Sequence, residues 1–161
     1  MSERRRAERG FTLVELVMTV AIVGVLASAA MPLASLVVQR SKEQELRQSL
    51  LQIREALDAH RWAFDQGRIP RGVTDSGFPK SLLDLTEGVV DQTSSDKKRI
   101  VFLRRLPRDP LSLDPSAPAE ETWGLRSYES PPDDPSPGND VFDVYSLHEG
   151  VGLNGIPYSK W

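Results

Sequence analysis

The stretch RGFTLVELVMTVAIVGVLASAAMPLASLVV, Arg9 to Val38, decides the fold of this chain because it is one long apolar run that contains a single acidic residue. From Phe11 onward, the only charged side chain in the run is that of Glu15. A helix rises about 1.5 Å per residue, so the segment from Leu16 to Val38 is long enough to cross a hydrocarbon layer of about 30 Å. The pattern therefore predicts a helix whose apolar first half spans a membrane.

The flank before this run is basic, with four arginines among the first ten residues: Arg4, Arg5, Arg6 and Arg9. Positive flanks tend to stay in the cytoplasm, which predicts a cytoplasmic N-terminus and an external head. Two simpler interpretations remain open: a secretory signal cleaved near the small residues Ala27 to Ala29, and an ordinary single-pass anchor. Both leave Glu15 without a role, although a carboxylate costs up to about 2.5–3.5 kcal/mol at a bilayer centre.

The rest of the chain is polar, acidic and rich in proline, and the 161 residues carry a formal charge of -3. This length suits one modest domain with an extension. The head has no basic surface, so nucleic acid is not an expected partner. The sequence has no cysteine, which excludes disulfides and thiolate metal sites.

An amphipathic pattern follows the apolar run from Gln39 onward. Apolar residues recur at steps of three, four or seven, which places them on one helical face: Leu46, Leu50, Ile53, Leu57 and Phe64. No proline or glycine interrupts this part before Gly67, so we expect one helix from about Phe11 to Gln66. Pro32 removes a backbone donor and is expected to kink or locally melt that helix.

The remaining segments predict a small head with an antiparallel pair of strands. KSLLDL, residues 80–85, is typical of a short helix or turn. TWGLRSYES, residues 122–130, and VFDVYSL, residues 141–147, are rich in β-branched and aromatic residues, and a Pro- and Asp-rich loop separates them. The fold class is therefore α+β, with a long N-terminal helix packed on a small antiparallel sheet.

No pattern of catalytic residues is evident. His60 falls in the amphipathic helix and His148 in a glycine-rich loop, and no spacing rule joins either to a nucleophile. GVGLNG, residues 150–155, follows the last expected strand with no helix after it, so it does not fit a dinucleotide-binding loop. We expect a protein that is not an enzyme.

The residues from Arg9 to Pro32 resemble the leader and first helix of type IV pilins and type II secretion pseudopilins. The resemblance implies that residues 1–10 are a leader ending in Gly10, which a prepilin peptidase removes. The same peptidase would methylate the new amino group of Phe11. Glu15 and Pro32 match the glutamate and proline of the family's assembly helix, and the implied fold is the pilin fold.

The resemblance gives Glu15 a physical role. Cleavage creates a cationic amine at Phe11 in apolar surroundings, where an unpaired ammonium or carboxylate is costly. If the amine belongs to a neighbouring subunit, the pair forms only at the right axial stagger, so one charge sets the register of the polymer. We therefore expect Glu15 to be an assembly residue.

Two further segments resemble the G-type major pseudopilin. These are Leu103 to Pro110 and the ending from residue 142, a region that forms a calcium-binding loop in that group. Residues such as His148 stand where the group has acidic ligands, and calcium needs six to eight oxygens. The remaining candidate ligands are Asp143, Ser146 and Glu149, and the alternative is a solvated acidic loop.

The expected organisation has four parts. They are a cleaved leader at 1–10, a transmembrane and polymerisation helix at 11–38, an amphipathic helix of the head at 39–66 and a periplasmic head at 67–161. The expected function is a structural pseudopilin subunit of a type II secretion system. The alternatives are a type IV pilus subunit and a membrane-tethered periplasmic binding domain that does not polymerise.

The expected partners follow from the same resemblance. They are further copies of the chain, minor pseudopilins, the prepilin peptidase and an inner-membrane assembly platform. The expected location is the bacterial inner membrane, crossed once with the N-terminus in the cytoplasm and the head in the periplasm, and then a periplasmic filament. Calcium is the only cofactor that the resemblance raises.

Overall fold

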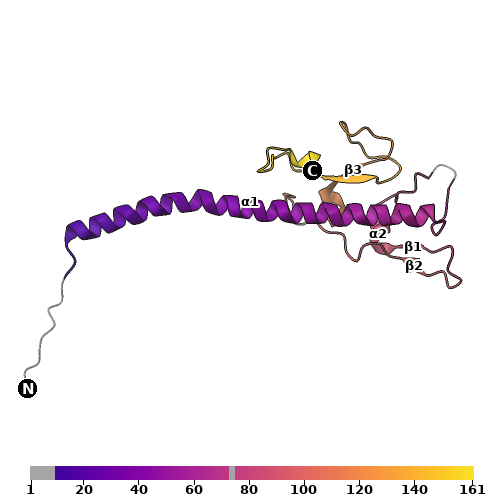
Figure 1. Ribbon diagram of the computed structural model, residues 1–161, viewed down its shortest axis with the longest axis horizontal. Coiled ribbons are helices and arrows are strands. Elements are labelled where there is room, and N and C mark those ends of the chain that lie inside the picture. Colours follow the sequence, from indigo (N-terminus) through magenta and orange to yellow (C-terminus); the bar gives the residue numbers. More distant parts are fainter. Residues whose placement is uncertain (1–9, 73–74) are drawn as a thin grey trace, which may run out of the picture. The chain divides into compact units, whose positions relative to one another are not determined.

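The computed structural model describes residues 10–72 and 75–161 (Figure 1). The chain divides into two compact units, Met1–Gln39 and Arg40–Trp161, which are considered separately below. Most of the expected leader, residues 1–9, lies outside the described residues. The long helix α1, Leu13–Asp65, has 53 residues and contributes to both units.

The bounds of α1 confirm the expected long helix to within two residues at each end. The backbone is helical through Pro32, so the expected local melting does not occur, and the side chains of residues 29–33 lie outside the description. Across residues 10–72 and 75–161, no helix combines the length and the apolar character that a membrane span requires. The membrane-spanning first half stays a prediction.

The second half of α1 supplies one wall of the head's core. Its inward face carries four apolar side chains that are at most 2% exposed: Leu46, Leu50, Ile53 and Leu57. Their spacing of three or four residues keeps them on one side of the helix. Leu51 and Trp62, on the outward face, are 58% and 60% exposed. The amphipathic pattern therefore predicted correctly which face of this helix is buried.

The described strands of the head form two small antiparallel sheets. In the first, β1, Val89–Val90, pairs with β2, Arg99–Ile100. In the second, β3, Trp123–Arg126, pairs with β4, Asp143–Ser146, in a register that sets Trp123 opposite Ser146. The second pair confirms the expected hairpin, whereas strands of two residues, as in β1–β2, are too short to produce a readable alternation.

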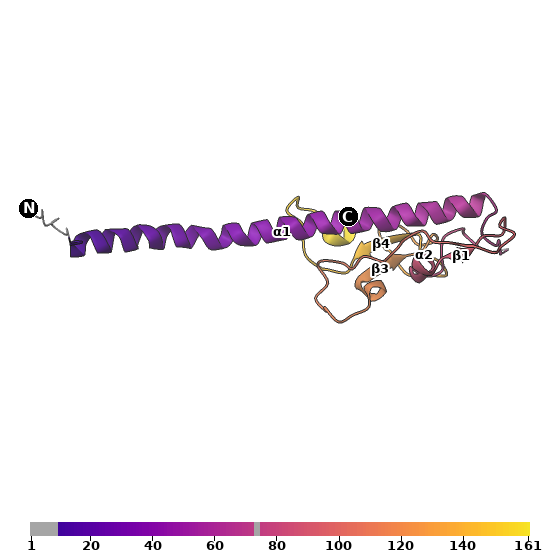
Figure 2. The same cartoon turned by 90° about the horizontal axis from the view of Figure 1, so that it is seen from below.

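The remaining elements are short. They are α2, Leu83–Glu87, and the two 3-10 helices η1, Ala119–Thr122, and η2, Tyr158–Lys160. In Figure 2, α2 and the strands lie on one side of the second half of α1. One hydrophobic cluster joins them to α1, and its other members include Leu82, Leu85, Leu106, Leu111, Trp123, Val141, Val144 and Tyr158. The head is thus built on one face of a helix.

The substitution Leu57→Ala tests this core. Leu57 is 1% exposed, so its truncation leaves a cavity and should lower the free energy of unfolding by about 2–5 kcal/mol. Leu51→Ala, the same change on the outward face, should stay within about 0.5 kcal/mol. Denaturant unfolding of the purified full chain measures both, and equal effects would contradict this assignment of faces.

Candidate assembly site

The start of α1 is held by a helix cap. Thr12 precedes the helix, and its Oγ1 accepts a hydrogen bond from the backbone N–H of Glu15 at 3.2 Å. The Thr12 carbonyl oxygen accepts a second bond from Leu16 N at 3.1 Å. A threonine followed three residues later by a glutamate is the capping-box pattern, and the positive end of the helix dipole favours a carboxylate in this turn.

The position of Glu15 in the first turn is therefore favoured by the helix cap and the helix dipole, before any contact with another molecule. The capping role of Thr12 was not among the predictions from the sequence. The signal that would have revealed it is the T-x-x-E spacing of residues 12–15 immediately before the apolar run. The cap fixes where α1 begins, and so it places Glu15 in the first turn of the helix.

Apolar side chains are exposed on every side of the first half of α1. Phe11 is 80% exposed, and the large apolar residues that follow are each at least 58% exposed: Leu13, Val14, Leu16, Val17, Met18, Val20, Ile22, Val23, Val25 and Leu26. A helix that is apolar all round is stable when other molecules or lipid bury it. This segment is thus a surface that needs a covering environment.

The hydroxyl groups within this segment are satisfied by the helix itself. Thr19 Oγ1 donates to the carbonyl of Leu16 at 2.9 Å, and Ser28 Oγ donates to that of Val25 at 2.7 Å. An ionised carboxylate only accepts hydrogen bonds, so Glu15 has no equivalent way to use a helix carbonyl. In an apolar environment, Glu15 therefore needs a donor or a cation from elsewhere.

The peptide bond expected to be cleaved lies before α1. Gly10 and Phe11 are exposed and are not helical, and a side chain at position 10 would meet no atom within 4 Å. Proteases need accessible backbone outside regular structure. The geometry of Gly10 and Phe11 is compatible with cleavage between them. Pro32, which was expected to act in assembly together with Glu15, lies farther along α1.

The three candidate calcium ligands do not meet. Alternation along β4 sends the side chains of Asp143 and Ser146 to opposite faces of the strand. Asp143 Oδ1 lies 2.8 Å from Arg54 Nε, whereas Ser146 Oγ donates to Asp109 Oδ2 at 2.5 Å. Asp143 and Ser146 thus already have partners within the chain, and those partners are different.

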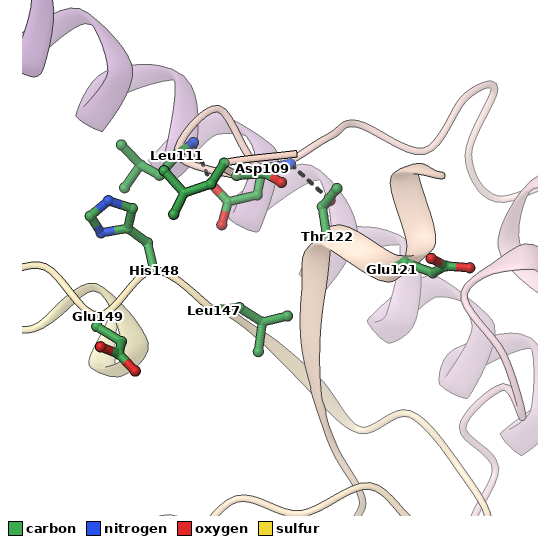
Figure 3. Close-up of a pocket in the computed structure, with 9 residues that line it drawn as sticks. Asp109, Leu111, Glu121, Thr122, Leu147, His148 and Glu149 are labelled. Atoms are coloured by element: carbon green, nitrogen blue, oxygen red, sulfur yellow. Dashed lines mark hydrogen bonds between the residues drawn. The ribbon is translucent and has the colours of Figure 1, made fainter. Parts of the chain in front are cut away.

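Glu149 lines an open cavity of about 510 Å³ together with Asp109, Glu121 and His148 (Figure 3). Asp109 also has a second partner within the head, because its Oδ1 accepts a hydrogen bond from Leu111 N at 2.7 Å. Within the described part of the chain, no three His, Cys, Asp or Glu residues are grouped closely enough to hold a metal ion. The donor set therefore does not fit the six to eight oxygens of a calcium site.

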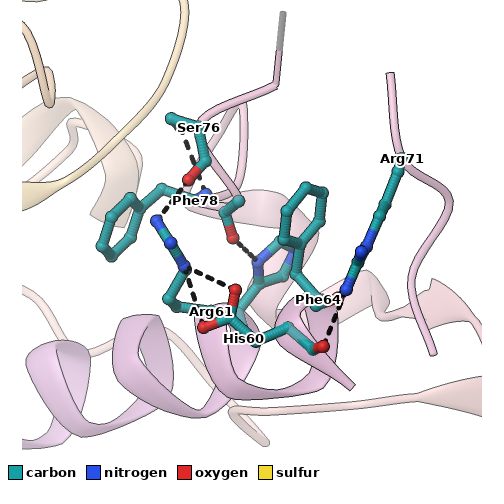
Figure 4. Close-up of polar contacts among 8 residues, drawn as sticks. His60, Arg61, Phe64, Arg71, Ser76 and Phe78 are labelled. Atoms are coloured by element: carbon teal, nitrogen blue, oxygen red, sulfur yellow. Dashed lines mark hydrogen bonds and ion pairs between the residues drawn. The ribbon is translucent and has the colours of Figure 1, made fainter. Parts of the chain in front are cut away.

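His60 has a structural role. Its buried ring donates from Nδ1 to the carbonyl of Gly77 at 3.0 Å, which ties the loop after α1 back to the helix (Figure 4). Burial lowers the pKa of His60, although the Gly77 contact and the charge of Asp84 oppose that shift. Arg61 secures the same loop, because its Nη1 donates to the Ser76 carbonyl.

The comparisons with known proteins agree with the geometry at the start of α1. Residues 5–31 match the family described as the prokaryotic N-terminal methylation motif. This match confirms the expected resemblance to pilins and pseudopilins as a class. No solved structure matches the chain significantly.

Within that class, the chain is similar to a particular protein, type II secretion system core protein G. The identity is 29% over 111 residues with the protein of Klebsiella michiganensis, and the match covers 69% of this chain and 73% of the relative. It is 31% over 107 residues with the protein of Pectobacterium carotovorum subsp. carotovorum, and covers 66% of this chain and 64% of that relative, just under two thirds. Both relatives are named as components of a type II secretion system.

The substitution His60→Asn tests the structural role of the histidine. Because folding lowers the pKa of His60 from its ordinary 6.5, the folded state disfavours the protonated ring. Its contribution to stability is therefore complete above pH 6.5 and is lost as the pH falls below that value. The asparagine of the variant would keep a donor for Gly77 but would not titrate. Between pH 8 and pH 5, the melting temperature should decrease more for the native chain than for the variant. An equal decrease in both would contradict this role.

Proposed function

We propose that the chain is a structural pseudopilin subunit of a type II secretion system, which polymerises into a periplasmic filament that supports protein secretion. The observation that carries this proposal is the helix that begins at the methylation motif and exposes apolar side chains on every side. Such a helix has no function for an isolated soluble head. It is suited to being held in a membrane and then in the core of a helical polymer.

Processing by a prepilin peptidase is the first step that we propose. The peptidase would cut the exposed bond between Gly10 and Phe11 and then methylate the amine of Phe11. The methylation motif supports this step, because residues 5–31 include both sides of the bond. Here the chain is the substrate of another protein's catalysis.

Assembly is the second step, and Glu15 is its key residue. The new amine at Phe11 is cationic, and its transfer into apolar surroundings is costly unless a carboxylate pairs with it. Glu15 is exposed in the first turn of α1, where a neighbouring copy can reach it. The pair forms at one axial stagger of two subunits, so it selects the register of the polymer.

Location and partners complete the proposal. The subunit would wait in the inner membrane with its N-terminus in the cytoplasm and its head, residues 67–161 with the second half of α1, in the periplasm. An inner-membrane assembly platform would move it into the filament beside further copies and minor pseudopilins. Pro32 lies within the polymerisation helix, where neighbouring helices can cover the backbone carbonyl that a proline leaves unpaired.

Mass spectrometry of the protein isolated from membranes tests the processing step. We expect a mature chain that begins at Phe11 and carries one added methyl group on its amine. A chain that keeps Met1 would indicate a plain tether, and one that begins at Ala30 would indicate an export signal. Either result would contradict processing by a prepilin peptidase.

The substitution Glu15→Leu tests the assembly step. It removes the counter-charge while it keeps the segment apolar, so cleavage should continue but incorporation into filaments should fall at least about tenfold, the equivalent of 1.4 kcal/mol. The measurement is the ratio of filament to membrane-bound subunit, by sedimentation of sheared fractions. Glu45→Leu is the matched control, since Glu45 is an exposed acidic residue of the same helix outside the apolar run. Normal incorporation of the Glu15 variant would remove the proposed role of this carboxylate.

A further inference from the structure

The segment from Leu147 to Trp161 lies against the second half of α1, and Figures 1 and 2 both show it beside that helix in yellow. Two side chains of α1, Glu43 and Arg54, hold it there. They are about three helical turns apart, so they project from the same side of the helix. Each makes more than one contact with the chain after β3.

Glu43 holds the middle of the segment. It is 5% exposed, and its Oε1 accepts hydrogen bonds from Leu153 N at 2.8 Å and from the Tyr158 hydroxyl at 2.9 Å. Hydrogen bonds to an ionised group are the stronger kind, and a buried carboxylate is expensive without them. A backbone amide and a side-chain hydroxyl thus both converge on one helix carboxylate.

Arg54 joins β4 to the last residue of the segment. Its Nε bonds Asp143 Oδ1 at 2.8 Å, and its Nη2 bonds the carbonyl oxygens of Trp161 at 2.7 Å and Val144 at 3.3 Å. A planar guanidinium offers several donors in a fixed arrangement, which suits such bridging. One cationic side chain therefore pairs with a carboxylate and donates hydrogen bonds to two main-chain oxygens.

The segment is also closed on itself. Gly152 N donates to the Ile156 carbonyl at 2.9 Å, and Tyr158 N donates to that of Gly150 at 3.1 Å. The ring of Tyr158 packs at 5.2 Å from that of Trp161, over which the Arg47 guanidinium lies at 4.5 Å. These contacts between groups of the chain itself give the segment a fixed shape against α1.

We infer that Glu43 and Arg54 form a clasp that closes this segment by protein contacts alone, so that the head folds and keeps its shape without a divalent cation. In the proteins that this ending resembles, a bound calcium ion would organise oxygens at this place. Here Arg54 supplies the positive charge for Asp143 and the donors for the carbonyls, and Glu43 supplies the organising acceptor. The inference concerns folding of the unit Arg40–Trp161 and does not depend on whether copies polymerise.

Thermal unfolding of the purified full chain, followed by tryptophan fluorescence, tests the metal independence. A ligand that binds only the folded state raises the melting temperature as its concentration increases. We expect the same midpoint in excess chelator and in millimolar calcium chloride. A midpoint that rises with calcium, or a segment 147–161 whose amides lose their exchange protection in chelator, would overturn the inference.

Substitutions in the clasp test the two helix side chains. Glu43→Leu should lower the melting midpoint by about 3–8 °C and should increase amide exchange at residues 150–161, and calcium should restore neither. Glu45→Leu is the matched control, because Glu45 is an exposed acidic residue close to Glu43 on the same helix. We expect no change in exchange for the control.

Milder variants keep the test informative if Glu43→Leu does not fold. Glu43→Gln retains an acceptor oxygen without the charge, and Arg54→Lys retains the charge without the planar set of donors. Both should give partial loss of protection that is confined to the segment 147–161 and to β4. Native protection of the segment in both variants would overturn the role of the clasp.

Discussion

One carboxylate on an otherwise apolar helix is the constraint on which this protein depends. Glu15 sits in the first turn of α1, where Thr12 caps the helix and every large neighbour is apolar and exposed. The helix dipole makes that position tolerable for a negative charge in water, but an apolar environment demands a cation as well. Burial of the exposed apolar side chains of α1 is therefore favourable. The charge of Glu15 restricts that burial to arrangements in which a counter-charge lies beside the carboxylate. In the polymer proposed above, this combination would supply both a driving force and a register.

The head, considered by itself, is stabilised by a different principle. The second half of α1 offers one apolar face to a set of short strands and turns, none of which would be stable alone. Ionic and polar side chains of the same helix then fasten the irregular parts, with His60 at the loop after α1 and with Glu43 and Arg54 at the segment that follows β4. The chain has no cysteine, so no disulfide fastens these parts of the head, and the directional contacts of α1 hold them.

The clasp also explains why the expected calcium ligands do not come together. Asp143 lies within the right stretch of chain, but its strand position directs it to Arg54, while Ser146 faces Asp109. A sequence resemblance compares residue types in order along the chain, and it carries no information about which face of a strand each side chain occupies in this fold. Asp143 and Ser146 therefore serve separate partners within the head and do not form one ligand set in this fold.

The sequence by itself determined the long helix, its buried face, the β3–β4 hairpin and the motif around Gly10 and Glu15. These features arise from local spacing: the period of a helix, the alternation of a strand and the residue pattern of the methylation motif, each of which is legible over a few residues. The two-residue strands β1 and β2 and the partners of Glu43 and Arg54 were decided by the tertiary structure. Such contacts join residues about a hundred positions apart, as between Glu43 and Tyr158, and no local periodicity encodes them. They exist because the packed core brings α1 and the last segment of the chain within hydrogen-bonding distance.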